Sequence, residues 1–139
     1  MIDEFLVDSF EGINRASRSG SYPILTIMTN NRISTTPSQP PIQSFNNPYA
    51  GHSVEYILHL FPRLDFFAIL DERSILDRTA LVVASSPSDG LQVVRAPFAS
   101  TEAILVALIS PLFTIQTFQE IAAHQGGVCD LLGYIGRDS

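Results

Sequence analysis

Three strand-length apolar runs, separated by short polar connections, most constrain how this chain can fold. They cover residues 66–70, 80–84 and 91–98. The first two runs are continuously apolar, which is typical of strands that are buried on both faces. The six residues SSPSDG join the second run to the third, and their proline and glycine suit the positions of a tight turn. These features predict an antiparallel hairpin.

The N-terminal segment has the spacing of an amphipathic helix. Its apolar positions are Ile2, Phe5, Leu6, Phe10 and Ile13. Acidic residues concentrate near its start, which complements the helix dipole. Gly12 lies inside this pattern and weakens the predicted helix, because glycine costs about 1 kcal/mol relative to alanine in a helix interior.

The remaining elements complete an α+β pattern. Further helices are predicted at 52–61, at 100–109 and from Thr117 to the glycine pair at 126–127, and further strands at 22–29 and 128–135. Consecutive strands followed by consecutive helices predict a mainly antiparallel sheet with helices packed on one face. The length of 139 residues suits a single domain over residues 1–139.

The clearest break in the pattern is the Pro-rich segment at residues 30–51. It contains several Ser, Thr and Asn residues and one charged residue. Loops of this length inside a domain are usually functional or disordered. Two interpretations stay open here, a surface loop and a lid over a pocket.

The charge composition argues against some classes of partner. The net charge is −6, and all eight basic residues are arginines, which are scattered along the chain. Binders of nucleic acid and of anionic membranes carry clustered basic residues, so neither class is predicted. Charged residues make up only 16% of the chain. We therefore expect an exposed apolar patch, a ligand cleft or a self-association surface.

Cysteine content and the N-terminus predict a cytoplasmic protein. The acidic N-terminal segment lacks the pattern of a signal peptide, and no stretch approaches the roughly 18 apolar residues of a membrane span. A single cysteine, Cys129, excludes an intrachain disulfide and fits a reducing compartment. Cys129 is either a small buried apolar residue or a nucleophile that pairs with His124.

Cofactor motifs are missing from the sequence. It has no P-loop, no glycine-rich dinucleotide motif, no HExxH, no paired CxxC and no EF-hand loop. His52 and His59 lie seven residues apart, with Glu55 and Asp65 as the nearby acids, which is too few ligands to predict a metal site. No cofactor and no metal are therefore predicted.

The best candidate for chemistry is the charged segment DERSILDR at residues 71–78, between the first two apolar runs. Polar residues at the end of a rigid sheet often form sites, and a carboxylate beside an apolar wall can act as a general acid or base. Arg95, on the third run, needs an acidic partner, for which Asp71 and Asp77 are available. We therefore predict Asp71, Asp77 and Arg95 as catalytic residues, and the alternative is a structural ion pair with a turn.

Three more side chains are candidate substrate-binding residues. Arg73 belongs to the charged segment, and Tyr56 and His59 belong to the helix predicted at 52–61. We predict these three side chains as substrate-binding residues.

The stretch FAILDERSILDRTALVVASSPSDGLQVVRAPF resembles the DUF6924 family of bacterial and fungal domains of unknown function. The likeness covers roughly residues 64–128 and rests on the Leu-Asp after a strand, on Ser74, on the Asp-Arg-Thr step into the next strand, and on LQVVRAPF. The resemblance implies no established activity. It implies that Asp71, Ser74, Asp77 and Arg95 are positions that the fold needs, and it implies a fungal source, where small domains serve secondary metabolism.

Two functions of different classes follow from these features. The first is a small, cofactor-free domain that binds an apolar small molecule, with an isomerase or cyclase using acid/base catalysis as its enzymatic form. The second is a non-catalytic module for protein interaction or self-assembly. A homodimer is compatible with either function.

Overall fold

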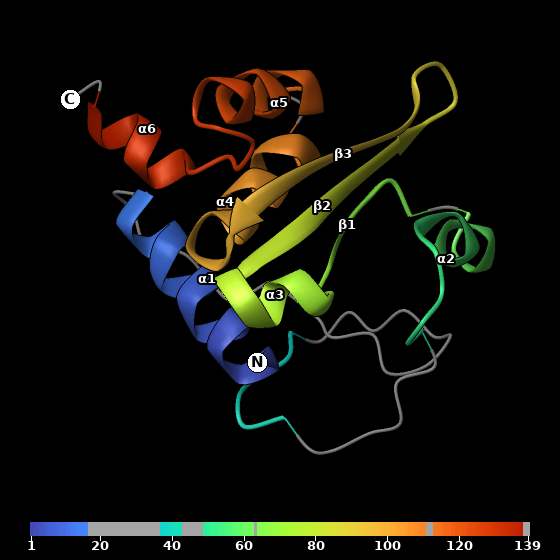
Figure 1. Cartoon of the computed structure of the whole chain (residues 1–139), viewed down its shortest axis with the longest axis horizontal. Coiled ribbons are helices and arrows are strands. Elements are labelled where there is room, and N and C mark those ends of the chain that lie inside the picture. The colour runs from blue at the N-terminus through green and yellow to red at the C-terminus, as the bar shows by residue number, and fades with distance from the viewer. Residues whose placement is uncertain (17–36, 43–48, 63, 111–112, 138–139) are drawn as a thin grey trace.

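The computed structural model describes residues 1–16, 37–42, 49–62, 64–110 and 113–137 (Figure 1). Its elements, in chain order, are α1 (Ile2–Ala16), α2 (Val54–Leu60), β1 (Phe66–Ile69), α3 (Glu72–Asp77), β2 (Thr79–Ser86), β3 (Gly90–Pro97), α4 (Phe98–Ile109), α5 (Ile115–His124) and α6 (Leu131–Arg137). The three strands form an antiparallel sheet in the order β1-β2-β3. All three predicted apolar runs are therefore strands.

The hairpin between β2 and β3 is confirmed. Its strands pair from Thr79 opposite Pro97 to Ser86 opposite Gly90. Gly90 has a φ of 71°, a left-handed conformation that glycine adopts without the steric cost that a Cβ would add. The Asp89 N–H donates to Ser86 Oγ at 3.0 Å, which satisfies one backbone donor of the turn. The SSPSDG segment therefore works as the turn that its sequence predicts.

Burial differs between the two runs that were expected to be buried on both faces. The central strand β2 fits the expectation, since Val82 and Val83 point to opposite faces and are both fully buried. All four residues of β1 are only half-buried, so the expectation is wrong there. Among the described strands β1 is an outer strand, which packs against neighbours on fewer sides than a central one.

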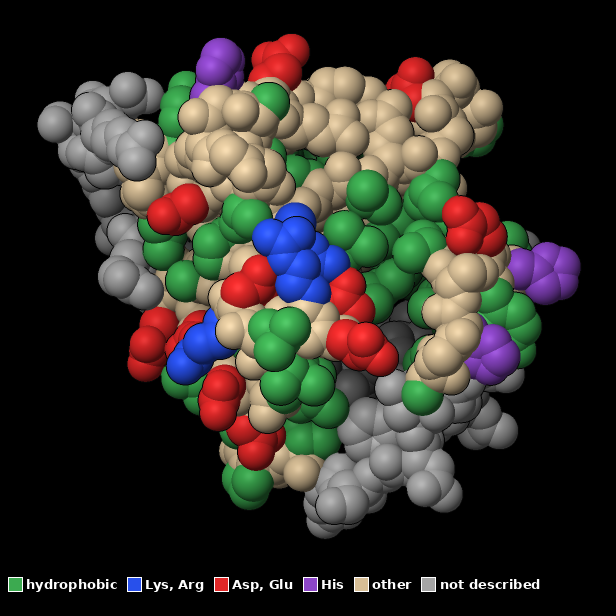
Figure 2. All heavy atoms as spheres, in the orientation of Figure 1, with side chains coloured by type: hydrophobic (Ala, Val, Ile, Leu, Met, Phe, Trp, Pro, Cys, Tyr) green, Lys and Arg blue, Asp and Glu red, His purple; other side chains and the backbone are tan. Residues whose placement is uncertain are grey.

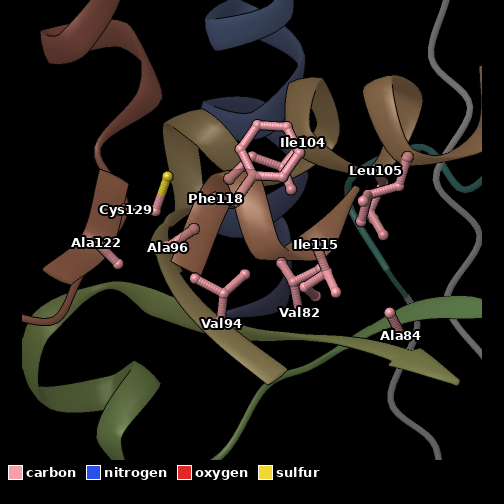
Figure 3. Close-up of a cluster of buried hydrophobic side chains, with 11 residues drawn as sticks. Val82, Ala84, Val94, Ala96, Ile104, Leu105, Ile115, Phe118, Ala122 and Cys129 are labelled. Carbon is pink, nitrogen blue, oxygen red and sulfur yellow. The ribbon is translucent and has the colours of Figure 1, made fainter. Parts of the chain in front are cut away.

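Helices α4 and α5 cover one face of the sheet, which confirms the α+β architecture (Figures 1 and 3). The core between them contains 11 buried residues: Val82, Ala84, Val94, Ala96, Ile104, Leu105, Leu108, Ile115, Phe118, Ala122 and Cys129. The strand members of this set alternate along the sequence, because successive strand residues point to opposite faces. The helix members recur at helical spacing.

The predicted N-terminal helix is confirmed as α1, which packs against α4. Phe5 and Phe98 meet edge to face, with ring centroids 5.2 Å apart. The buried Ser9 hydroxyl donates to the Phe98 carbonyl at 2.7 Å. A Cβ at Gly12 would lie 1.7 Å from the Ala99 carbonyl oxygen, so the backbones of the two helices meet there. Gly12 is thus a requirement of the packing rather than a weakness of the helix.

The strand predicted at 128–135 is wrong. Val128 makes an isolated parallel bridge with Arg95, and the Cys129 N–H donates to the Arg95 carbonyl at 2.7 Å. The chain then turns into α6, where the Asp130 carboxylate accepts from the Gly133 N–H at 3.0 Å. This side-chain bond satisfies a free donor in the first helical turn, which favours helix over strand after Asp130.

The other helices are confirmed with shifted starts. Ser53 caps α2 by accepting from the Tyr56 N–H at 3.2 Å. Helix α5 begins at Ile115, two residues before the predicted Thr117, and ends at His124, just before the Gly126–Gly127 pair. The Gly127 N–H donates to the Ala122 carbonyl. Within the described part of the chain, none of the helices is both long enough and apolar enough to cross a bilayer.

Two predicted segments lie wholly or mostly outside the described residues. The strand predicted at 22–29 is one, and the Pro-rich segment at 30–51 is described only at 37–42 and 49–51. The Ile42 N–H donates to the Asp3 carboxylate at 2.9 Å, and Ile42 packs against the cluster around Phe5 and Phe98. The role of the segment as a lid stays a prediction.

Candidate functional site

The charged segment after β1 forms a short helix, α3, rather than the predicted turn. A capping box starts it: the Asp71 carboxylate accepts from the Ser74 N–H at 3.1 Å, and the Ser74 hydroxyl accepts from the Asp71 N–H at 2.9 Å. Arg78 ends it in the left-handed region, with a φ of 56°. The residues DERS contain an N-cap acid three positions before a serine, which is the sequence signal for this start.

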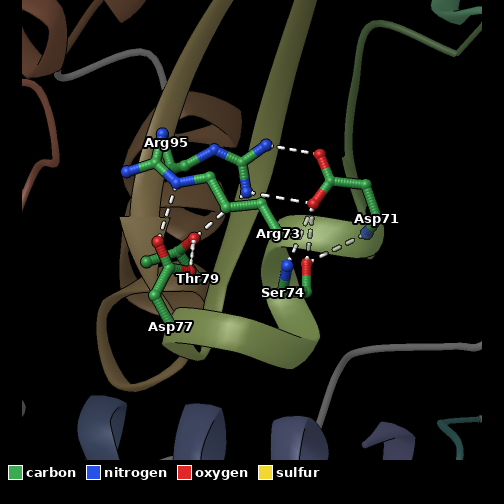
Figure 4. Close-up of polar contacts among 6 residues, drawn as sticks. All are labelled: Asp71, Arg73, Ser74, Asp77, Thr79 and Arg95. Carbon is green, nitrogen blue, oxygen red and sulfur yellow. Dashed lines mark hydrogen bonds and ion pairs between the residues drawn. The ribbon is translucent and has the colours of Figure 1, made fainter.

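Arg95 and Asp71 form an ion pair on the sheet face that points away from α4 and α5 (Figure 4). Arg95 Nη1 lies 3.1 Å from Asp71 Oδ1, and Arg95 Nη2 donates to Asp71 Oδ2. The Arg95 side chain is 11% exposed and that of Asp71 is 36% exposed. The expected acidic partner of Arg95 is therefore Asp71, in the two-point geometry that suits a guanidinium.

The hydroxyl of Thr79 connects this pair to a second one. It accepts from Arg95 Nη1 at 3.0 Å and donates to Asp77 Oδ1 at 2.5 Å. Asp77 Oδ2 in turn accepts from Arg73 Nε at 2.7 Å. We call Asp71, Arg73, Asp77, Thr79 and Arg95 the rim network (Figure 4). It holds α3 against the start of β2 and against β3.

Both carboxylates of the rim network are held in their ionised form. The hydrogen bond from Arg95 lowers the pKa of Asp71 below its usual 3.8, against a smaller opposing effect of burial. The hydrogen bond from Thr79, followed by that from Arg73, lowers the pKa of Asp77. A carboxylate with a lowered pKa is a weak base at neutral pH. The geometry therefore favours structural ion pairs, and acid/base catalysis by Asp71, Asp77 and Arg95 stays a prediction.

The other predicted binding residues are divided between two places. Arg73 belongs to the rim network, whereas Tyr56 and His59 lie on α2, which Figure 1 places apart from α3. The Tyr56 ring stacks on that of His52, with centroids 4.1 Å apart. The structure thus brings four of the six predicted site residues together and leaves Tyr56 and His59 apart from them.

Cys129 is a buried apolar residue of the core. Burial, helped by the Asp130 charge, raises the pKa of its thiol to about 11. A neutral, fully buried thiol is a poor nucleophile, so pairing with His124 has no support here. Among the described residues, no group of three or more His, Cys, Asp and Glu side chains is placed to hold a metal ion.

A cleft of about 360 Å³ lies on the other face of the sheet, near the hairpin turn. We call it the hairpin cleft. Its wall consists of the strand ends, the turn, and the region from the end of α4 to the start of α5. The lining residues are Asp65, Phe66, Ala84, Ser85, Ser86, Pro87, Asp89, Gly90, Gln92, Leu108, Phe113, Thr114, Ile115 and Gln116. None of the six predicted site residues is among them.

The polar contact inside the hairpin cleft joins the sheet to α5. Gln116 Nε2 donates to Gln92 Oε1 at 2.9 Å. Gln92 occupies a position on β3 that points toward the helices, where its neighbours Val94 and Ala96 are apolar and buried. A polar residue on the inner face of a strand is the sequence signal for this site, and it is visible only once the strand's inner face is known.

The sheet face around the rim network is partly exposed. Leu91 and Val93 on β3 are 36% and 39% exposed, and Ile75 and Leu76 on α3 are 68% and 86% exposed. Figure 2 shows an apolar area beside the arginine and acidic side chains near the centre of this view. The exposed apolar patch that the low charge content predicts is therefore present.

The lowered pKa of Asp71 predicts how stability depends on pH. A carboxyl with a lowered folded-state pKa adds stability above its unfolded pKa of about 3.8 and loses that contribution as the pH falls through the folded value. We expect the Asp71→Asn variant to have a lower free energy of unfolding than the wild type at pH 7. The difference between the two should become smaller toward pH 3. Urea unfolding at both pH values measures the gap.

A matched control for this experiment is Asp89→Asn, because no ion pair of the Asp89 carboxylate is found among the described residues. Its free energy of unfolding should match that of the wild type at both pH values. A gap for Asp71→Asn that stays constant from pH 7 to pH 3 would contradict the ion pair with Arg95.

Comparisons of the chain with family models, with curated proteins and with solved structures found no match. The resemblance to the DUF6924 family therefore stays a prediction.

Proposed function

We propose that this protein is a cofactor-free domain that binds a small, largely apolar molecule in the hairpin cleft. The observation that carries the proposal is the cleft itself, whose volume of about 360 Å³ lies within the range of roughly 300–1,000 Å³ typical of ligand sites. A cytoplasmic location is part of the proposal and rests on the single cysteine.

The wall of the hairpin cleft supports an apolar ligand. Phe66, Leu108, Phe113 and Ile115 supply aromatic and aliphatic surface. Gln92 supplies amide hydrogen-bonding capacity beyond the bond that it makes with Gln116. Apolar walls with a few placed polar groups are the usual composition of small-molecule sites.

The proposal concerns binding first. Asp71 and Asp77, the predicted acid/base groups, do not line the hairpin cleft, and their lowered pKa values suit ion pairs. An isomerase or cyclase reaction would need a substrate that reaches the rim network, on the opposite sheet face. Turnover is therefore a further step of the hypothesis, which the binding proposal does not require.

A tryptophan reporter tests the proposal directly, because the chain contains no tryptophan. Phe113 lines the hairpin cleft and is 50% exposed, so Phe113→Trp places an indole at the site with little change of shape. We expect titration with 1-octanol to shift the emission of this variant in a saturable way. The reason is that the alkyl chain replaces water at the indole.

The matched control is Leu76→Trp, which places the reporter on α3, outside the cleft wall, at a position that is 86% exposed. Its emission should stay unchanged over the same titration. Equal responses of the two variants, or no saturable response of Phe113→Trp, would exclude a specific site in the cleft.

The alternative is a non-catalytic interaction or self-assembly module. The exposed apolar residues Ile75, Leu76, Leu91 and Val93 favour it, because large exposed apolar side chains often mark interfaces. A homodimer through this face would be compatible with an open hairpin cleft, since the two lie on opposite faces of the sheet. In a pure interaction module, the Phe113→Trp titration gives no saturable response.

A further inference from the structure

We infer that the ligand of the hairpin cleft is a cationic amphiphile, an apolar molecule that carries an amine. This inference rests on the proposed function and adds the chemical class of the ligand. It comes from the charge of the lining residues, which include two acidic residues, Asp65 and Asp89, and no basic residue among those described.

The two acidic residues, Asp65 and Asp89, belong to the same end of the hairpin cleft. The Asp65 carbonyl accepts from the Ser85 N–H at 2.9 Å, and the Asp89 N–H donates to Ser86 Oγ at 3.0 Å. Both aspartates are thus anchored to adjacent residues at the end of β2. Both are exposed, and neither makes an ion pair among the described residues.

The helix side of the hairpin cleft is largely apolar, with Thr114 and Gln116 as its polar residues. Leu108 comes from the end of α4, and Phe113 and Ile115 flank the start of α5. The wall therefore has a largely apolar part on the helices and an acidic part at the end of the sheet, where Asp65 precedes β1 and Asp89 lies in the hairpin turn. A ligand that matches both parts has an apolar body and a positively charged head.

An anionic ligand is disfavoured by the same geometry. A carboxylate or phosphate in the cleft would lie near two acidic lining residues, Asp65 and Asp89, without a compensating cation among the described lining residues. The net charge of −6 for the whole chain adds a repulsive field. A neutral ligand would use the apolar wall and Gln92 and gain nothing from the aspartates.

Three probes of equal chain length test the charge preference in the Phe113→Trp variant: 1-octanol, octylammonium and octanoate. We expect octylammonium to bind at least about fivefold more tightly than octanoate, because a unit charge a few ångströms from a carboxylate in water is worth about 1 kcal/mol. Octanol should lie between them. The preference should shrink in 0.5 M NaCl, because salt screens exposed charges.

The double variant Asp65→Asn/Asp89→Asn identifies the source of the preference. In the Phe113→Trp background it should bind octanol as before and lower the affinity for octylammonium to that for octanol. The matched control is Glu55→Gln/Glu72→Gln, which changes the net charge by the same amount at two exposed residues outside the cleft wall. This control should still bind octylammonium more tightly than octanoate.

The outcomes separate the two proposals. Equal affinities for the three probes, or tightest binding of octanoate, would overturn the cationic ligand and leave the apolar cleft in place. Loss of the preference for octylammonium in the Glu55→Gln/Glu72→Gln control would also overturn the cationic ligand, because the preference would then come from the net charge of the chain. No saturable binding of any probe would overturn both the ligand class and the proposed function.

Discussion

Phe98→Ala is expected to lower the free energy of unfolding by about 3–5 kcal/mol, the usual cost of removing a buried aromatic ring. Phe98 is 1% exposed and lies where β3 ends and α4 begins. Its ring meets Phe5 of α1 edge to face, and the buried cluster around it includes Leu6 and Ala80. The substitution therefore leaves a cavity at the point where the sheet, α1 and α4 meet.

Urea unfolding followed by far-UV circular dichroism measures this loss. Leu76→Ala is the control, because Leu76 is 86% exposed and its truncation should change stability by no more than about 0.5 kcal/mol. A double-mutant cycle with Phe5→Ala should show a coupling of about 0.5–1.5 kcal/mol from the ring pair. Equal costs for the Phe98 and Leu76 variants would show that α1 does not pack on Phe98.

Gly12→Ala is the second substitution with a large expected effect, and its sign is informative. Helix propensity alone would make alanine stabilising by about 1 kcal/mol. The structure predicts a net destabilisation, because the added methyl would lie 1.7 Å from the Ala99 carbonyl oxygen and 2.6 Å from its carbon. Both atoms belong to the backbone, so α1 must move away from α4, at a typical overpacking cost of about 1–3 kcal/mol or more.

The same unfolding measurement, with Glu11→Ala as control, tests this prediction. Glu11 is the preceding residue of α1 and is exposed, so its replacement should have little effect. A Gly12→Ala protein that is as stable as the wild type, or more stable, would contradict the close contact of α1 with α4.

The two polar regions of the molecule differ in what they can do. In the rim network each carboxylate has an arginine partner, Arg95 for Asp71 and Arg73 for Asp77, so its charge is already compensated within the fold. In the hairpin cleft, Asp65 and Asp89 make no ion pair among the described residues and lie beside an apolar wall. A carboxylate without an ion-pair partner in the protein is free to attract a cation on a ligand, which is why we place the ligand in the cleft.

Local pattern was sufficient for most of the secondary structure. The strands, the hairpin and the two helices that cover the sheet follow from apolar runs, turn residues and helical spacing, all of which act over a few neighbouring positions. The errors occur at 71–77 and 128–135, where short helices replace a predicted turn and a predicted strand. In both places a capping side chain, from Asp71 or Asp130, starts a helix too short to show apolar periodicity.

The sequence by itself determined the sheet, its helical cover and the need of Arg95 for an acidic partner, because alternation, spacing and the cost of burying a charge are local properties. The tertiary structure alone decided that Gly12 is a contact point and that residues as far apart in the sequence as Asp65 and Gln116 line one cleft. It also chose Asp71 over Asp77 as the partner of Arg95. Each of these depends on which distant residues meet when the chain packs, and no short window of sequence carries that information.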